Sequence, residues 1–322
     1  MKKQNNAEKI LKKKDAEKET VKINFNYSKI LSAAVIIILI YACVWYLTKP
    51  DWSVSNTGII NYNIPGVVNY EKNFVEETDN DKIYKIIFES RDTKIYGLLR
   101  IPKNNSGKLP GVVILPGAGV SKDGETKTPE ALSKMGYITL TIDQRDVGET
   151  KKNNKEPYSA GADYERFKNN TEPITYKMIF DVISAHNLMK NFDETDSSKV
   201  TIIGISNGGR MAIIAAAIDP GIKTVIGIST AGYAIGNNGN SEDDRIKFYK
   251  SIDPDNYIPL ISPGKVVMIH SKNDPGMPIE SAKRTFSSAK EPKEFIEVSC
   301  NLHGYCDEME QHLENELKEI FK

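Results

Sequence analysis

The sequence predicts an α/β protein: an eight-stranded, mostly parallel sheet with helices on both faces, preceded by one N-terminal transmembrane helix. Three observations lead to this fold class. Short apolar runs recur after residue 80, helical patterns separate the later runs, and an uncharged segment lies near the N-terminus. Continuous apolar strands that alternate with helices are typical of a parallel sheet that is buried on both faces.

The uncharged segment, residues 30–47, is the predicted membrane helix. Its 18 residues contain no charge, and this length is sufficient to cross the hydrocarbon core of a bilayer. Trp45 and Tyr46 lie at its far end, and aromatic side chains of this kind favour the headgroup region. A cleaved signal peptide is the alternative, but no small-residue cleavage site follows the apolar run.

The charges around this segment predict its orientation. Residues 1–29 hold nine lysines and four acidic residues, and basic residues tend to stay on the cytoplasmic side of a membrane span. We therefore expect a single-pass cell-membrane protein with a basic cytoplasmic tail (1–29), a juxtamembrane linker (48–80) and an extracellular domain (81–322). Over all 322 residues, 43 basic side chains balance 43 acidic ones, which argues against a dedicated nucleic-acid-binding protein. The oligomeric state stays open.

The outer domain is predicted to contain eight strands and five helices. The strands are Ile83–Ser90, Lys94–Ile101, Gly111–Leu115, Tyr137–Asp143, Val200–Ile205, Thr224–Ser229, Val266–His270 and Glu294–Ser299. The helices are Pro129–Met135, Ile174–Lys190, Gly208–Ile218, Ile279–Ala289 and Asp307–Phe321. The first two strands alternate apolar and polar residues, which indicates an antiparallel pair. The segment 48–80 is polar and irregular, so we expect a juxtamembrane linker that could contain a short strand.

A strand, a sharp turn and a helix follow one another at residues 199–220. The apolar run Val200–Ile205 leads into the G-x-S-x-G pattern of residues 204–208, and an Ala/Ile-rich helical stretch comes next. A serine on such a turn projects its hydroxyl above the sheet, while the glycines allow the backbones to pass closely. The start of the helix supplies N–H groups that can stabilise an oxyanion. We therefore interpret Ser206 as a candidate nucleophile; a glycine-rich connection without chemistry is the alternative.

Two later strand ends supply a candidate acid and a candidate base. Asp274 follows the strand Val266–His270, and His303 lies in the short loop after the last strand. Catalytic groups of α/β sheets gather beyond the carboxyl ends of the strands, so we expect both side chains at the same edge as Ser206. Asp274 has an alternative role as the cap of the helix that starts at Ile279.

These motifs resemble the α/β-hydrolase fold over about residues 83–321, most of all its esterase, dienelactone-hydrolase-like and prolyl-oligopeptidase-like branches. The serine turn at residues 204–209 and the acid turn at residues 269–274 carry the resemblance. Residues 116–119 (PGAG) stand where the family has its first oxyanion loop, and residues 143–150 (DQRDVGET) are similar to its D-x-R-G-x-G-x-S loop. Pro116 replaces the usual His of the oxyanion loop.

The resemblance implies a serine hydrolase that forms an acyl-enzyme. Ser206 is the implied nucleophile, His303 the general base, and Asp274 the carboxylate that orients the base. The backbone N–H of Asn207 is the implied first oxyanion donor, and the second comes from one of three residues, Gly117, Ala118 or Gly119. No metal ion and no organic cofactor are expected.

The substrate stays open within this class. We favour hydrolysis of small or surface-displayed carboxylic esters, because residues 81–322 leave no room for a propeller domain of the oligopeptidase type. A small serine peptidase of the aminoacyl or dipeptidyl type is one alternative, and a non-catalytic surface binding protein that keeps the fold is another. The segment 150–173, with Tyr158, Tyr164 and Phe167, is expected to overhang the site and shape the acyl pocket.

Two cysteines, Cys300 and Cys306, lie on either side of His303. In an oxidising compartment they could form a disulfide that closes a tight loop around the base. Two free thiols are the alternative.

Overall fold

The computed structural model describes residues 27–48, 51–64, 66–103, 107–153, 158–236 and 243–322, which divide after Pro50 into two compact units. The first unit contains helix α2 (Tyr27–Thr48), which includes the predicted membrane segment, residues 30–47. Most of the predicted tail, up to residue 26, lies outside the described residues. Within the described ranges, no helix combines the length and the hydropathy that a membrane span needs.

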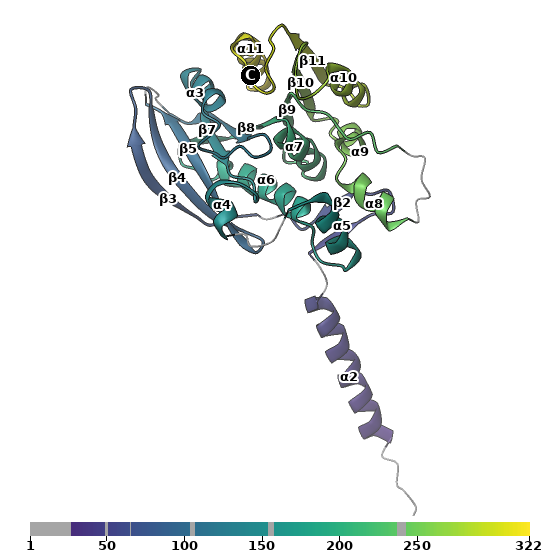
Figure 1. The fold of residues 1–322 in the computed structure, drawn as a ribbon. Helices are drawn as coiled ribbons and strands as arrows, with labels where there is room; N and C mark the ends of the chain where they lie inside the picture. The colour runs from purple at the N-terminus through teal and green to yellow at the C-terminus, as the bar shows by residue number, and fades with distance from the viewer. Residues whose placement is uncertain (1–26, 49–50, 65, 104–106, 154–157, 237–242) are drawn as a thin grey trace, which may run out of the picture. The chain divides into compact units, whose positions relative to one another are not determined.

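The second unit is built on a nine-stranded sheet with the order β11-β10-β9-β8-β6-β7-β5-β4-β3 (Figure 1). Neighbouring strands from β7 to β11 pair in parallel, and the pairs β7–β5, β5–β4 and β4–β3 are antiparallel. The strands are β3 (Tyr70–Glu77), β4 (Asp81–Ser90), β5 (Thr93–Pro102), β6 (Leu109–Leu115), β7 (Ile138–Ile142), β8 (Thr195–Ile205), β9 (Thr224–Ile228), β10 (Lys265–Ser271) and β11 (Lys293–Val298). The predicted mostly parallel sheet is confirmed, but the predicted count of eight strands is wrong.

The additional strand, β3, lies in the segment that we predicted to be a linker. It is an edge strand that pairs with β4, with a register shift between Phe74 and Glu76, and most of its side chains are exposed. An edge strand with exposed faces needs no apolar alternation, so its polar sequence, YEKNFVEE, conceals it. Two short strands in the same segment, β1 (Trp52–Val54) and β2 (Ile60–Tyr62), form a separate antiparallel pair.

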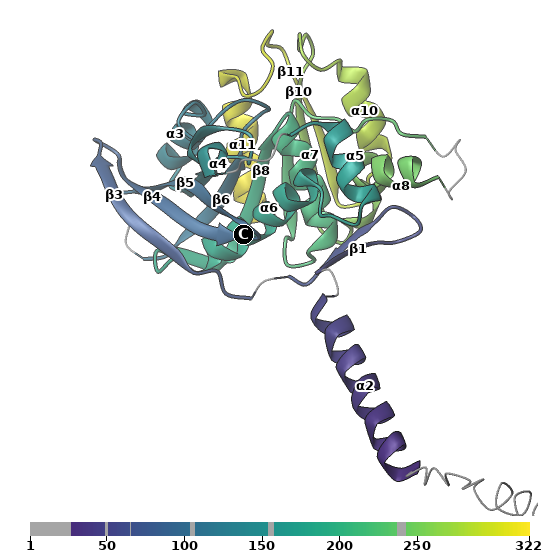
Figure 2. The same cartoon turned by 60° about the horizontal axis from the view of Figure 1, so that its bottom comes forward.

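Two layers of helices cover the sheet (Figure 2). One layer contributes to the larger apolar core and consists of α6 (Ile174–Lys190), α7 (Asn207–Ile218), α8 (Asp244–Ser251), α9 (Pro254–Tyr257) and α10 (Ile279–Ser287). The other layer contributes to a smaller core and consists of α3 (Lys127–Lys134) and α11 (Glu310–Ile320). Short 3-10 turns lie at Ile258–Leu260 and Asp307–Met309.

The side chains of strand β6 point alternately to the two faces of the sheet, and this alternation separates the two cores. Val113 and Leu115 face the larger core, whereas Val112 and Ile114 face the smaller one, and all four are buried. Burial of a Val, Leu or Ile side chain contributes about 1.5–3 kcal/mol. Both cores therefore stabilise the central strands, whose ends position the site.

Residues 150–173, which we expected to overhang the site and shape the acyl pocket, lie elsewhere in the fold. This segment forms α4 (Gly148–Asn153) and α5 (Ala160–Lys168), with residues 154–157 outside the described part. Tyr164 and Phe167 pack against Phe248 of α8, with ring centroids 5.9 and 5.5 Å from it. These two rings belong to the edge of the larger core, and neither they nor Tyr158 line the pocket at Ser206. The prediction that they shape this pocket is wrong.

Candidate active site

Ser206 occupies the turn between β8 and α7 in a backbone conformation that residues other than glycine rarely adopt. Its φ is 53° and its ψ is −115°. Such a conformation costs about 1–3 kcal/mol and is typically found at functional sites. Two glycines make the turn possible, because a Cβ on Gly204 would overlap the carbonyl oxygen of Gly208, and a Cβ on Gly208 would overlap that of Leu115. The local sequence therefore holds the serine in a sharp, strained turn.

Ser206, His303 and Asp274 form one chain of hydrogen bonds. Ser206 Oγ lies 2.9 Å from His303 Nε2, and His303 Nδ1 lies 2.8 and 3.0 Å from the two carboxylate oxygens of Asp274. Because a carboxylate only accepts hydrogen bonds, the neutral ring carries its proton on Nδ1, and Nε2 can accept the serine hydroxyl. The parallel strands β8, β10 and β11 end at the same edge of the sheet, which brings these three residues together.

Asp274 is held in its ionised form. Its side chain is 0% exposed, and the N–H groups of Gly276 and Met277 donate hydrogen bonds to its Oδ1 at 2.8 and 2.9 Å. Burial alone would raise the pKa of Asp274, but hydrogen bonds from these two N–H groups and from the side chains of Ser229 and His303 hold the pKa below its usual value. A carboxylate at this position can stabilise a protonated imidazole.

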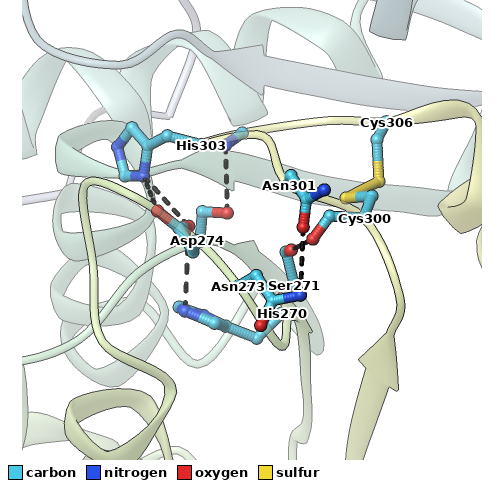
Figure 3. Close-up of a disulfide and its surroundings, with 10 residues drawn as sticks. His270, Ser271, Asn273, Asp274, Cys300, Asn301, His303 and Cys306 are labelled. Atoms are coloured by element: carbon cyan, nitrogen blue, oxygen red, sulfur yellow. Dashed lines mark hydrogen bonds and ion pairs between the residues drawn. A yellow bond between two sulfur atoms is a disulfide. The ribbon is translucent and has the colours of Figure 1, made fainter.

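A second histidine, His270, supports the turn that carries Asp274. It is fully buried, as its position at the end of an apolar strand predicts. Its Nε2 hydrogen-bonds the carbonyl of Met277 at 2.8 Å and lies 3.7 Å from Asp274 Oδ2. Figure 3 shows the carboxylate of Asp274 between the rings of His303 and His270. The sequence pattern did not predict this second contact to the acid.

The loop that carries His303 is fixed at both ends. Cys300 and Cys306 form a disulfide (Figure 3). Of the two alternatives, a disulfide or two free thiols, the structure contains the disulfide. The hydroxyl of Ser271 donates to the carbonyl of Cys300, and the N–H of Gly304 donates to Ser229 Oγ at 3.0 Å. These contacts limit the positions that the imidazole can adopt.

The predicted oxyanion donors lie on two segments next to Ser206. Asn207 is the first residue of α7, and the first N–H groups of a helix have no intrahelical acceptor. On the other segment, a Cβ added to Gly117 would lie 3.6 Å from the Cβ of Ser206. Gly117 and Ala118 line the pocket at Ser206, while Gly119 turns the chain with a φ of +76°. The arrangement favours Gly117 and Ala118 over Gly119 as sources of the second donor.

The side chain of Gln144 joins these two donor segments. Its Nε2 donates to the carbonyl of Pro116 at 2.5 Å, and its Oε1 accepts from Asn207 Nδ2 at 3.1 Å. Gln144 and Asn207 are both buried. Gln144 lies in the loop at residues 143–150, and its residue type alone predicts no role there. Its position just beyond the carboxyl end of β7 is the signal that could have identified it.

A pocket of about 460 Å³ lies over the serine and the histidine. This volume is within the range of small-molecule sites in proteins. Its lining combines the oxyanion loop, the segment before α3 and the histidine loop, and consists of Gly117, Ala118, Val120, Gly124, Glu125, Thr126, Lys127, Ile205, Ser206, His303, Gly304 and Tyr305.

Among the described residues, one group of side chains has the spacing of a metal site. The ligand atoms of Cys300, Cys306 and Glu308 lie within 4.8 Å of one another. The two sulfurs are joined in the disulfide, whereas metals bind cysteine as the thiolate. In this state the group does not have the chemistry of a metal site.

Comparison with known proteins relates the chain to esterases. Residues 67–231 match the model of the family described as acetyl xylan esterase (AXE1). The uncharacterized protein YfhR of Escherichia coli O157:H7 is 30% identical over 145 residues, which are 44% of this chain and 51% of YfhR. The chain thus spans about half the length of the curated relatives it matches.

Solved structures show the fold. An acetyl xylan esterase from Paenibacillus sp. R4 has a TM-score of 0.64 at 18% identity, and the likeness covers 79% of this chain and 89% of that one. The alpha/beta hydrolase GrgF from Penicillium sp. sh18 has a TM-score of 0.57 at 17% identity, covering 74% of this chain and 97% of GrgF. The described body therefore has the α/β-hydrolase fold, as the sequence motifs predict.

Proposed function

The chain belongs to the acetyl xylan esterase (AXE1) family, and on this basis we propose that it is a serine hydrolase that cleaves carboxylic esters through an acyl-enzyme. The observation that carries the proposal is the hydrogen-bonded chain from Ser206 Oγ through His303 to Asp274. A serine with a base in hydrogen-bond range, and a carboxylate that orients the base, is the arrangement required for nucleophilic acyl transfer.

In the acylation step, Ser206 Oγ attacks the ester carbonyl carbon while His303 Nε2 takes the hydroxyl proton. Asp274 stabilises the imidazolium that forms. The carbonyl oxygen becomes an oxyanion, which the N–H of Asn207 and an N–H of the loop at Gly117 stabilise. When the intermediate collapses, the ester C–O bond breaks and His303 returns its proton to the departing alcohol.

In the deacylation step, water takes the place of the alcohol. His303 removes a proton from the water, whose oxygen attacks the acyl carbon, and the bond to Ser206 Oγ breaks as the serine regains its proton. The products are a carboxylic acid and free enzyme. These steps use the chain's own side chains and backbone N–H groups.

Acetyl esters of a polymeric sugar are the substrate class that we propose. Support comes from the family and from the similar structure of the Paenibacillus protein, which is an acetyl xylan esterase. The pocket of about 460 Å³ has both polar and apolar lining residues, which suits a small acyl group bound next to a hydroxylated alcohol.

A fluorophosphonate probe tests the proposed nucleophile, because it reacts covalently with activated serines. We expect the full chain to be labelled at Ser206, as identified by mass spectrometry of the modified peptide, and the variant Ser206→Ala to stay unlabelled and inactive on 4-nitrophenyl acetate. Ser287→Ala, which changes an exposed serine on α10, serves as the matched control and should behave like the wild type.

The same assay separates the alternative functions. Turnover of an aminoacyl 4-nitroanilide in place of the acetyl ester would indicate a small peptidase. A wild-type chain that neither reacts with the probe nor turns over either substrate would indicate a binding protein on a hydrolase fold. Wild-type turnover by Ser206→Ala would contradict the assignment of the nucleophile.

We also propose that residues 30–47 anchor the chain in the cell membrane, with the N-terminus in the cytoplasm and the catalytic domain outside. Support comes from the uncharged sequence and the lysines that precede it, and from apolar side chains of α2 that are exposed, such as Leu31, Ile37 and Leu39. Carbonate-resistant membrane fractionation tests the anchor, and protease treatment of intact cells tests the orientation. Recovery of the full chain in the soluble fraction would contradict the proposal.

A further inference from the structure

Arg210 lies on the first turn of α7, four positions after the proposed nucleophile Ser206. Its N–H donates to the carbonyl of Ser206 at 3.2 Å. Helical side chains lean towards the N-terminus of their helix, so the guanidinium is directed back to the edge of the sheet that carries Ser206. Arg210 does not line the pocket at Ser206. A bound substrate would therefore meet this side chain just beyond that pocket.

The loop after β9, residues 229–233, connects Arg210 to the site. Thr230 Oγ1 donates to the carbonyl of Ser206 at 2.8 Å. The next residue, Ala231, accepts a hydrogen bond from Arg210 Nε at its carbonyl oxygen, also at 2.8 Å. Adjacent residues of one loop thus contact the nucleophile and the arginine, which places the guanidinium beside Ser206.

The guanidinium of Arg210 is held in position before any ligand binds. Its central carbon lies 4.2 Å from the ring centroid of Tyr233, the geometry of a cation–π contact. The loop below it is fixed in turn, because the N–H of Tyr233 donates to Asp253 Oδ1 and Arg284 donates to the carbonyl of Gly232, both at 2.8 Å. A side chain that is already ordered loses less conformational freedom on binding.

Arg210 has free donors for an anionic group. The side chain is partly exposed, and among the described residues its Nη1 and Nη2 have no hydrogen-bond partner and are not buried. The nearby acids are already used, since Asp253 accepts from backbone N–H groups of the loop and Asp255 pairs with Arg284 at 3.3 Å. The planar fork of an arginine matches the two oxygens of a carboxylate.

We propose that Arg210 binds a carboxylate on the alcohol part of the substrate, so that the enzyme prefers acetyl esters of anionic alcohols. This inference rests on the proposed esterase function. An acetyl group has no further polar group, and the carboxylate must therefore belong to the alcohol. The ester is cleaved at Ser206 while the carboxylate lies outside the pocket, against the guanidinium.

The test compares acetyl esters that differ in one charge: 4-acetoxybenzoate and its neutral amide, 4-acetoxybenzamide. The corresponding 3-acetoxy isomers place the carboxylate at a second position. The measured quantity is the ratio of kcat/KM for the carboxylate to kcat/KM for the amide. A purely structural change in the loop affects both substrates alike and leaves this ratio constant.

For Arg210→Gln, we expect the ratio to fall about five- to tenfold for at least one isomer, through the loss of one partly exposed, charge-assisted contact. Arg210→Lys keeps the charge but not the planar fork, so the ratio should fall less. Arg245→Gln is the matched control, because Arg245 of α8 is an exposed arginine that also lies over a tyrosine ring, that of Tyr164, at 5.7 Å. It should keep the wild-type ratio.

Thermal unfolding checks that the variants are folded. A wild-type chain that neither reacts with the fluorophosphonate probe nor turns over 4-nitrophenyl acetate would overturn the proposed function itself. An active wild type whose ratio is the same in Arg210→Gln for both isomers would overturn the role of Arg210 alone.

Discussion

The side chains of Gln144 and Asn207 are joined by a buried hydrogen bond of 3.1 Å. The other end of the same Gln144 amide donates to the carbonyl of Pro116, immediately before the loop at Gly117. One side chain therefore connects the two backbone segments that the proposed mechanism uses to stabilise the oxyanion. Catalysis of this kind depends on donors that are already in position before the charge develops.

We expect Gln144→Leu to lower kcat for 4-nitrophenyl acetate by about 10- to 100-fold, less than the loss of a whole oxyanion donor, while KM changes little. The physical reason is that both segments remain but are no longer held together. Asn207→Ala keeps the backbone N–H and removes the same hydrogen bond. If the bridge positions the donors, the double variant should lose no more than the larger single effect. An unchanged kcat in Gln144→Leu would contradict this role.

Reduction of the disulfide between Cys300 and Cys306 should lower both stability and activity. Closure of this short loop contributes about 2 kcal/mol in the chain-entropy model, and the loop carries His303. We expect a reductant to decrease the free energy of unfolding by this amount and to reduce kcat several-fold. The double variant Cys300→Ser/Cys306→Ser should show these losses and no further response to reductant.

Cys43→Ser is the control for the reductant, because Cys43 is an exposed free cysteine of α2. This variant should respond to the reductant as the wild type does. Equal activity and stability of the oxidised and reduced wild-type chains would show that the other loop contacts are sufficient.

The buried His186 of α6 predicts a loss of stability in mild acid. Burial and the nearby charge of Lys190 lower its pKa to about 4, whereas an unfolded histidine has a pKa of about 6.5. The unfolded chain therefore binds the proton first as the pH falls. Between pH 7 and pH 5 this single group should lower the free energy of unfolding by about 2 kcal/mol.

Urea unfolding of the wild type and of His186→Gln at these two pH values measures the contribution. We expect the variant to be less sensitive to pH by about the same 2 kcal/mol. His312→Gln, at an exposed position on α11, is the control and should keep the wild-type pH dependence. An equal loss of stability in the wild type and in His186→Gln would refute the prediction.

Gly208→Ala should damage the site through the backbone. The added Cβ would overlap the carbonyl oxygen of Leu115 and crowd that of Pro116, and these atoms cannot move without displacing the oxyanion loop. We expect a loss of about 1–3 kcal/mol in stability together with a lower kcat. Gly161→Ala in α5, where no atom lies within 4 Å of the added Cβ, should be neutral or stabilise the protein by up to about 1 kcal/mol. Equal effects at the two positions would contradict the steric explanation.

The parts of the fold that were predictable from sequence are those with a strong repeating signal. The strands β6 to β11 are apolar runs between helical patterns, and their carboxyl ends meet at one edge. That rule alone is sufficient to expect Ser206, Asp274 and His303 near each other, although the sequence separates the first from the last by 97 positions. Their catalytic roles stay a prediction.

Other features were not predictable because their signal exists only after folding. Strand β3 is polar and exposed, so no apolar alternation marks it. The contacts of Gln144 connect positions 28 and 63 residues away, and they depend on how the turns pack. The sequence does not show whether Tyr164 and Phe167 face a pocket or the core, because aromatic side chains occur in both places. Their packing against Phe248 depends on the position of α8 in the fold.

The strands that carry the acid and the base, β10 and β11, form one end of the sheet, beyond β9. Ser206 and His303 lie 97 positions apart in the sequence, and contacts between distant parts of a chain form late, because closing a long loop costs conformational entropy. A molecule whose earlier strands have already paired is thus structured but unable to react. The return of esterase activity during refolding should therefore report when β10 and β11 dock on the rest of the sheet. This activity should lag behind the recovery of secondary structure.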